Sequence, residues 1–394
     1  MEGWVIMPRM KYLTGNAIHL GNFLRAMGVY LPYLVYSTFL STRIPESFVG
    51  VAFATASIIA AIVVLHTPIL FRRYRTYRVL IVSSCVAAAA LLGLSLEPST
   101  PVLLLLFVVA WVAGWIVALS LDVILEKIVG VHEETTGSAR AIFLTASNIA
   151  VAIASLIIAV SLTNGDYWRI FTIAAGAFLA CAYISFKFFA PIQHVIQTKV
   201  KISEAVRAIC KDPSLLSVMG AHFIMQLIFV WSAIYMPLYL HNHAGLSWSS
   251  IGVIFALAML PYILLQAPVG FLADTKFGEK EFIVGGFIIS ALGFAAFLFA
   301  HGASLFILAL LVIGVHTGSA LLEIATETYF FKKVGARDSE VISVFRVLRQ
   351  CATIGGPIVG SVVLFFAPFE WAFVVFGGIT LLGIPLSLTL KDTL

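Results

Sequence analysis

Long apolar stretches, roughly a dozen of them, follow one another through almost all of the 394 residues. Each has about 20 residues or more, which as an α-helix is enough to cross the roughly 30 Å hydrocarbon core of a bilayer. Hydrophobic residues make up 61% of the chain and charged residues only 11%. Because no soluble core could bury so much apolar surface, the sequence predicts an all-α polytopic membrane protein.

The apolar stretches divide into twelve expected spans, joined mostly by short connections. The one long hydrophilic segment lies at about 191–213, in the middle of the chain. No connection has room for a soluble domain, so we expect any binding to occur inside the helical bundle or at its ends. The expected spans are 14–40, 47–70, 77–96, 101–126, 138–162, 168–190, 214–240, 248–271, 281–300, 303–328, 339–366 and 370–390.

Basic residues gather on one side of this predicted topology. They precede the first span, follow spans 2, 8 and 10, fill the central segment and occur at the C-terminus, whereas the opposite connections hold little beyond Arg43 and Arg169. This positive-inside pattern predicts a cytoplasmic (inner or plasma) membrane protein with both termini in the cytoplasm. It also explains the net charge of +5 by the lipid bilayer rather than by a nucleic-acid partner. The four cysteines show no metal-binding or pairing pattern, so we expect no metal and no cofactor.

The two halves of the chain resemble each other at an offset near 200. Asp122 and Glu126 near the end of span 4 correspond to Glu323 and Glu327 near the end of span 10, each pair 201 residues apart. These echoes predict two six-helix bundles related by pseudo-two-fold symmetry, a transporter architecture. The expected domains are an N-terminal bundle (1–190), a cytoplasmic linker with a short amphipathic helix (191–213) and a C-terminal bundle (214–394).

Span 8 ends in a loop, Gly270 to Lys280, with a characteristic order of residues. Gly270 is followed four positions later by Asp274, and basic residues surround Gly278, which is suited to a turn with positive φ. This loop resembles the cytoplasmic-loop signature of the major facilitator superfamily. It departs from that signature because Thr275 occupies the usual basic position and Gly278 comes one residue late.

The resemblance implies a latch that joins the two halves on the cytoplasmic side. Asp274 would meet the start of span 5, where Arg140 supplies a positive charge. The equivalent loop of the first half has lost its glycine and aspartate, and for it we hypothesise a charge-swapped latch. In that latch Arg72 or Arg73 faces Asp338 and Glu340; the alternative is that the arginines bind lipid headgroups. The latch candidates are Gly270, Asp274, Gly278, Arg140, Arg72, Arg73, Asp338 and Glu340.

Ionisable side chains inside the spans are costly and usually functional. We expect Arg25 to pair with Asp122, and Arg346 to pair with Glu323. Arg349 then has no obvious partner. It either binds an anionic group of the substrate or forms a gate across the halves with Asp122 or Glu126. Asp122 and Glu323 are also the carboxyl groups available for proton coupling, with a structural salt bridge as the alternative role.

Polar and aromatic residues within the spans are candidates for lining a substrate cavity. His222 and Gln226 are one helical turn apart, and two polar side chains on one face need a reason to leave lipid. Hydrogen bonding and packing between helices are the alternative roles for this whole group. The cavity candidates are Arg349, Arg346, His222, Gln226, Tyr33, Trp115, Asn148 and Gln266.

Taken together, these features favour a secondary active transporter that moves a small solute by alternating access. We expect a monomer, with proton coupling as a possible energy source. One alternative is a drug or metabolite efflux antiporter of the same superfamily, although span 5 lacks the Gly-Pro motif usual in such antiporters. Another is an integral membrane enzyme, but no clustered catalytic set is present in the sequence. The expected protein is therefore a transporter and not an enzyme.

Overall fold

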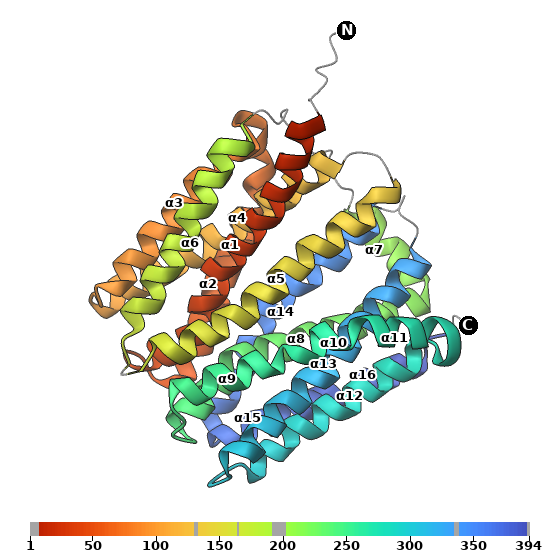
Figure 1. Ribbon diagram of the computed structural model, residues 1–394. Helices are drawn as coiled ribbons and strands as arrows, with labels where there is room; N and C mark the ends of the chain where they lie inside the picture. Colours follow the sequence, from red (N-terminus) through yellow and green to blue (C-terminus); the bar gives the residue numbers. More distant parts are fainter. Residues whose placement is uncertain (1–7, 130–132, 164, 191–201, 335–338, 392–394) are drawn as a thin grey trace. The chain divides into compact units, whose positions relative to one another are not determined.

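The computed structural model describes residues 8–129, 133–163, 165–190, 202–334 and 339–391, apart from some side chains within helices, among them those of residues 8–14, 133–141 and 202–205 (Figure 1). Within these residues all regular structure is helical. The helices are α1 (Pro8–Ser41), α2 (Glu46–Arg73), α3 (Thr76–Ser95), α4 (Thr100–Val129), α5 (Glu133–Ser161), α6 (Tyr167–Phe188), α7 (Ile202–Lys211), α8 (Pro213–Asn242), α9 (Trp248–Ala258), α10 (Leu260–Leu264), α11 (Gln266–Leu272), η1 (Ala273–Phe277), α12 (Glu279–Ala296), η2 (Phe297–Phe299), α13 (Leu305–Lys333), α14 (Ser339–Phe366), α15 (Phe369–Leu381) and α16 (Gly383–Leu388).

The long helices correspond to the expected spans. Eleven segments of the described chain are long and apolar enough to cross a membrane, and α1 adds a further helix of 34 residues. The predicted all-α membrane fold is thus confirmed. The expected eighth span is divided into α9, α10 and α11. Pro261 lies at the start of α10, where its missing N–H cannot continue the hydrogen bonding of α9.

The chain forms two compact units. The first comprises Met1–Val35 and Ala56–Thr198, and the second comprises Tyr36–Thr55 and Lys199–Leu394. The end of α1 and the start of α2 therefore belong to the second unit, although they lie in the N-terminal half of the sequence. We call this segment, Tyr36–Thr55, the hairpin. The predicted domain boundaries at the central linker stay a prediction; α7 forms within that linker.

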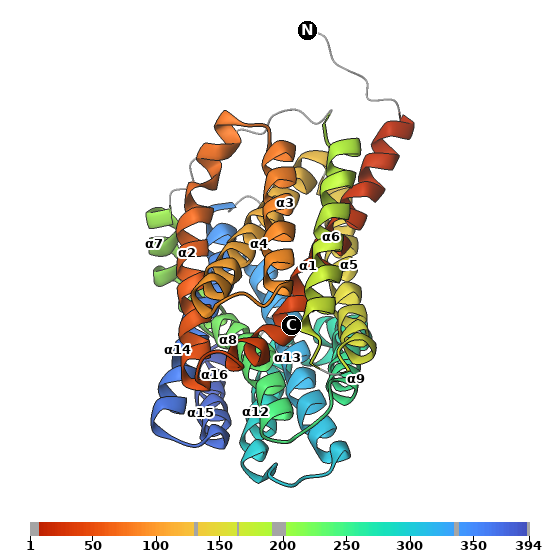
Figure 2. The ribbon, with the colours of Figure 1, turned by 90° about the vertical axis from the view of Figure 1, so that its left-hand side faces the viewer.

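The internal packing of the two units follows the same scheme, as the duplication predicts. In the first unit α3 packs against α4 and α6; in the second unit the corresponding helix, α12, packs against α13 and α15 (Figures 1 and 2). Glycine allows the close approach in both cases. A Cβ at Gly93 would lie 2.8 Å from Leu106, and a Cβ at Gly293 would lie 2.6 Å from Val315. Two six-helix bundles are therefore the architecture of this chain.

The helix α8, which carries several candidate residues, is capped at its N-terminus by Asp212. The Asp212 carboxylate accepts hydrogen bonds from the backbone N–H groups of Ser214 and Leu215, at 3.0 and 3.2 Å. Pro213 occupies the first turn, where no N–H is needed. Lys333, the last residue of α13, lies 3.2 Å from the second carboxylate oxygen. The cap thus also joins the start of α8 to the end of α13.

Candidate functional site

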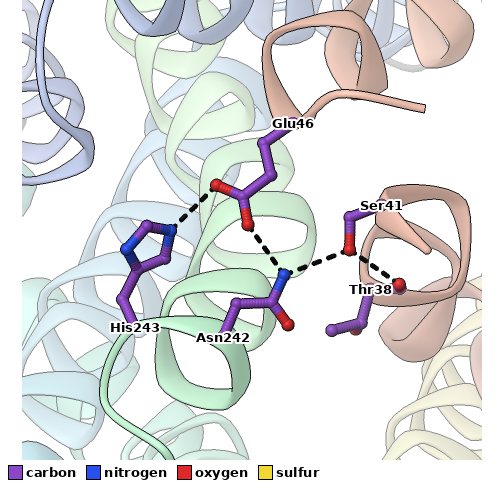
Figure 3. A network of polar contacts seen from close by, with 5 residues as sticks. All are labelled: Thr38, Ser41, Glu46, Asn242 and His243. Atoms are coloured by element: carbon purple, nitrogen blue, oxygen red, sulfur yellow. Dashed lines mark hydrogen bonds and ion pairs between the residues drawn. The ribbon is translucent and has the colours of Figure 1, made fainter. Parts of the chain in front are cut away.

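The hairpin contacts the end of α8 through a network of polar side chains (Figure 3). The amide nitrogen of Asn242 donates to Glu46 Oε1 at 2.7 Å and to Ser41 Oγ at 3.1 Å. The second carboxylate oxygen of Glu46 lies 2.8 Å from His243 Nε2. The Ser41 hydroxyl in turn donates to the carbonyl oxygen of Thr38 at 2.8 Å. The side chains of Asn242 and Glu46 thus join the end of α8 to the start of α2.

The electrostatics of this network favour a protonated His243. The hydrogen bond to Glu46 raises the pKa of His243 above its ordinary value of 6.5, burial opposes this, and the charges of Glu46 and Glu370 add to it. The side chains of His243 and Glu46 are 36% and 28% exposed, so water reaches both. The ring of His243 also stacks on Tyr239, with centroids 5.7 Å apart, and lies 4.7 Å from Phe369.

Next to the network, the hairpin fits closely against α14. The rings of Phe48 and Phe365 meet edge to face with centroids 5.0 Å apart. Gly50 lies so close to α14 that a Cβ there would overlap the Pro357 carbonyl oxygen and the Tyr235 hydroxyl. No side chain fits between the hairpin and α14 at this point, so the contact depends on glycine.

The part of α14 that receives the hairpin is itself held by α8. The indole N–H of Trp231 donates to the carbonyl oxygen of Gly356 at 2.9 Å, and the Tyr235 hydroxyl donates to that of Pro357 at 2.7 Å. In a membrane helix, polar side chains of a neighbouring helix can bond backbone carbonyl groups in this way. The hairpin therefore rests on a surface that two aromatic side chains of α8 keep in place.

A second polar cluster lies inside the second unit, around His222. Gln226 donates from its amide nitrogen to His222 Nε2 at 3.0 Å, so this ring nitrogen accepts. The other ring nitrogen, Nδ1, lies 3.2 Å from the Thr326 hydroxyl, which donates to the Leu322 carbonyl at 2.7 Å. This assignment describes a neutral imidazole with its proton on Nδ1. The Phe345 ring covers the imidazole at 4.0 Å.

Charged residues of α13 and α14 interact with one another, and one of them acts on His222. The charges of Glu327 and Arg349 act on Glu323, and that of Arg349 also acts on His222. Arg349 thus has electrostatic partners in its own unit, which the sequence did not indicate. The expected pairing of Glu323 with Arg346 stays a prediction. His222 and Gln226 are buried, whereas Arg346 and Arg349 are exposed.

In the first unit, Arg25 belongs to a network between α1 and α5. Its guanidinium donates to Asn22 Oδ1 at 2.9 Å and to Ser147 Oγ at 3.1 Å. Asn22, which is fully buried, donates to the Phe143 carbonyl at 2.6 Å and to Ser147 at 2.8 Å. The role of Asn22 was not predicted from the sequence. The expected pair of Arg25 with Asp122 stays a prediction.

The aromatic candidate Tyr33 lies in the same unit. Its ring packs edge to face on Trp111 of α4, with centroids 5.3 Å apart. Trp115, one turn further along α4, and Asn148 of α5 are half-buried. The side chain of Gln266, the remaining candidate for the cavity, lies outside the described residues.

Of the latch candidates, Gly278 behaves as its position in the motif predicts. It has a φ of +75° between η1 and α12, and its N–H bonds the Ala273 carbonyl at 3.1 Å. Directly after it, the buried carboxylate of Glu279 pairs with Lys332 of α13 at 2.6 Å. Gly270 is half-buried, and Arg72 and Arg73 are exposed. Asp338 and the side chains of Asp274, Arg140 and Glu340 lie outside the described residues, so both latches stay predictions.

The hairpin network was missed by the sequence reasoning, which concentrated on charges inside the spans. A signal was present: Ser41 and Asn242 end the first helix of each half and are 201 residues apart, the same offset as the acidic pairs. Glu46 and His243 follow shortly after these two positions. Among the described residues no group of three or more His, Cys, Asp or Glu side chains could hold a metal ion.

The family model described as Major Facilitator Superfamily matches residues 18–259 and 232–393. An uncharacterized MFS-type transporter of Mycobacterium tuberculosis (strain ATCC 25618 / H37Rv) is 29% identical over 130 residues, which are 33% of this chain and 30% of the relative. A putative uncharacterized MFS-type transporter of the strain CDC 1551 / Oshkosh matches to the same extent. The chain thus matches 30% of the length of these curated relatives.

Three solved structures with the same fold are named as transporters or as a homolog of one. A mutant of the nucleoside transporter NupG superimposes with a TM-score of 0.77 at 12% identity, covering 95% of this chain and 99% of the other. The peptide transporter POT in complex with sulfate gives a TM-score of 0.74 at 12% identity, covering 98% and 94%. A bacterial homolog of the human lysosomal transporter Spinster gives 0.71 at 12% identity, covering 95% of each chain. At this identity the likeness concerns the fold.

Proposed function

Since this chain belongs to the Major Facilitator Superfamily, we propose that it is a secondary active transporter that carries a small solute across the cytoplasmic membrane by alternating access. The observation that carries this proposal is the hairpin. A segment of the N-terminal half, Tyr36–Thr55, packs as part of the second unit. Two bundles that rock against each other must break and remake such a contact in every cycle.

The hairpin is proposed to be a gate on the non-cytoplasmic side. The one-sided distribution of basic residues supports a topology with both termini in the cytoplasm. The hairpin and the end of α8 then lie at the opposite membrane face. Glu46, Asn242 and His243 hold this gate by hydrogen bonds, while Gly50 allows the two surfaces to touch. The side chains of His243 and Glu46 in this contact are 36% and 28% exposed, and a contact that water reaches suits repeated opening.

The polar cluster around His222 is proposed to face the transported solute. It offers an imidazole, an amide and a hydroxyl in one chain of hydrogen bonds, next to the charges of Arg349 and Glu323. Such groups bind a polar solute or accept a proton within the bundle. Glu323 is the carboxyl group of this unit that we propose for proton coupling, with Asp122 as its counterpart in the first unit. Catalytic activity forms no part of the proposal.

The test combines a solute screen with an exchange assay. Purified protein is heated in detergent with sugars, nucleosides, peptides, organic acids, amino acids and cationic dyes, because a solute that binds the native state raises the unfolding temperature. The stabilising solute is then loaded into proteoliposomes, and uptake of its labelled form is measured. A carrier that alternates exchanges the label for internal solute, so uptake should rise transiently above equilibrium.

The matched variants are Arg349→Gln and Arg75→Gln. Arg349→Gln should weaken the apparent affinity about tenfold or more if the guanidinium contacts the solute, whereas Arg75→Gln, at an exposed position between α2 and α3, should not. Uptake that never exceeds equilibrium in the wild-type protein would contradict alternating access. An unchanged affinity in Arg349→Gln would remove that arginine from the solute site.

A further inference from the structure

We infer that Glu46, Asn242 and His243 form a proton-binding latch, which closes the hairpin onto the second unit more firmly when the surrounding solution is acidic. The inference rests on the proposed movement of the hairpin and adds its regulation. Two elements distant in the sequence meet at the latch, the start of α2 and the end of α8 (Figure 3). Their contact includes a titratable pair, His243 and Glu46, 2.8 Å apart.

The geometry gives each group of the latch one role. Asn242 donates both amide hydrogens to the hairpin, to Glu46 and to Ser41, and these bonds do not depend on pH near neutrality. His243 supplies the titratable contact, 2.8 Å from Glu46. A neutral imidazole can donate one hydrogen bond here, but an imidazolium forms a charge-assisted bond, which is roughly twice as strong. The latch therefore has a constant part and a proton-dependent part.

Neighbouring groups shift the pKa of His243. On α15 the carboxylate of Glu370 acts on it with the same sign as Glu46, while the rings of Phe369 and Tyr239 cover the imidazole. The hydrogen bond to Glu46, together with the charges of Glu46 and Glu370, raises the pKa of His243 above 6.5 in the latched state, although burial under the two rings acts in the opposite direction. When the hairpin leaves, His243 loses Glu46 and its pKa falls back toward its ordinary value.

The sign of the pH effect follows from this difference. A group whose pKa is higher in one state stabilises that state fully below its pKa in the other state. The extra stability of the latch is therefore present below about pH 6.5 and is lost as the pH rises through the raised pKa of the latched His243. Acid outside the membrane should hold the hairpin closed, and mild alkali should release it.

The test measures the position of the hairpin directly. Spin labels are attached at Thr42 and Leu305, two exposed positions, in protein whose four cysteines, Cys85, Cys181, Cys210 and Cys351, have been replaced. Thr42 lies on the hairpin and Leu305 begins α13, so the distance between the labels reports whether the hairpin rests on the second unit. Pulsed electron spin resonance in lipid nanodiscs between pH 6 and 8.5 gives the populations of the latched and released distances.

We expect the ratio of latched to released protein to fall on the order of three- to tenfold between pH 6 and 8.5. His243→Gln and Glu46→Gln should each remove most of this dependence, since both keep hydrogen-bonding groups but remove the charge pair. His301→Gln is the matched control. This histidine is exposed in the loop before α13, outside the latch, and its replacement should leave the pH dependence unchanged.

The outcomes separate this inference from the proposed function. If both distances are observed but the ratio of their populations does not change with pH, the proton-binding latch is rejected and the movement of the hairpin is retained. A pH dependence that survives in His243→Gln would also overturn the inference. A single distance at every pH would reject both the latch and the movement.

Discussion

Single glycine residues decide how closely α14 approaches its neighbours. A Cβ at Gly360 would overlap the ring of Tyr235, whereas a Cβ at Gly355, five residues earlier in the same helix, would meet nothing within 4 Å. Both glycines carry the same entropic cost in a helix, so their different surroundings can be compared directly. The sequence shows both in one Gly-rich stretch and does not distinguish them.

Gly360→Ala should therefore destabilise the protein by about 1–3 kcal/mol, because the methyl group forces Tyr235 out of its position. Gly355→Ala should be neutral or stabilise by up to about 1 kcal/mol, since alanine lowers the entropy of the unfolded chain. Unfolding in mixed detergent and SDS micelles measures both. Equal free energies of unfolding for the two variants would show that the close contact at Gly360 does not contribute to stability.

At the scale of one element, α8 links most of the features described above. Its start is capped by Asp212, its middle carries the His222 cluster, and its end holds the hairpin through Asn242. Burial raises the pKa of Asp212, but the Leu215 N–H, Lys333 and the Ser214 N–H together keep this pKa below its ordinary value. A carboxylate with a lowered pKa stabilises the folded state at neutral pH.

Asp212→Ala should lower the stability by about 0.5–2 kcal/mol, because two N–H groups lose their partner. Asp212→Asn should retain most of the stability, since asparagine also caps helices well. The wild-type contribution is present above the unfolded pKa of 3.8 and disappears as the pH falls through the lower folded pKa. Unfolding curves between pH 3 and 7 should show this loss of stability in the wild type and not in Asp212→Asn. An Asp212→Ala variant as stable as the wild type would contradict the capping role of Asp212.

At the scale of the whole molecule, the two duplicated halves differ in one respect, the hairpin, which only the first half contributes. Each half repeats the packing of its third span on its fourth and sixth, yet only the first half contributes a segment to the other compact unit. The contact includes a glycine, Gly50, that leaves no room for a side chain. This makes the closed position of the hairpin sensitive to a single substitution.

Gly50→Leu should displace the hairpin from α14. The distance distribution between spin labels at Thr42 and Leu305 should then show a larger population of released protein. Exchange of solute in proteoliposomes should fall about tenfold or more, because the gate no longer closes in each cycle. The matched control is Gly176→Leu on α6, where a new side chain meets open space. An unchanged distance distribution in Gly50→Leu would show that the hairpin contact has no role in the cycle.

Much of this architecture was predicted from the sequence, because hydrophobicity in a bilayer acts locally. A run of about 20 apolar residues is long enough to cross the bilayer, and there a helix bonds all its backbone groups internally. Repeated acidic residues such as Asp122 and Glu323 indicate the duplication. Gly278 was identified in the same way, since a positive φ is a property of one residue and its turn.

The partners of individual side chains depended on the tertiary structure. Whether Arg349 acts on Glu323 and His222, or Asn242 on Glu46, depends on the rotation of each helix about its axis and on the depth at which two helices meet. Neither quantity is present in a hydrophobic pattern of period 3.6. The sequence therefore determined that two helical bundles fill the membrane. Only the tertiary structure decided that the hairpin of the first half packs with the second, because a contact between residues some 200 positions apart is set by how the helices pack and not by the local pattern of the chain.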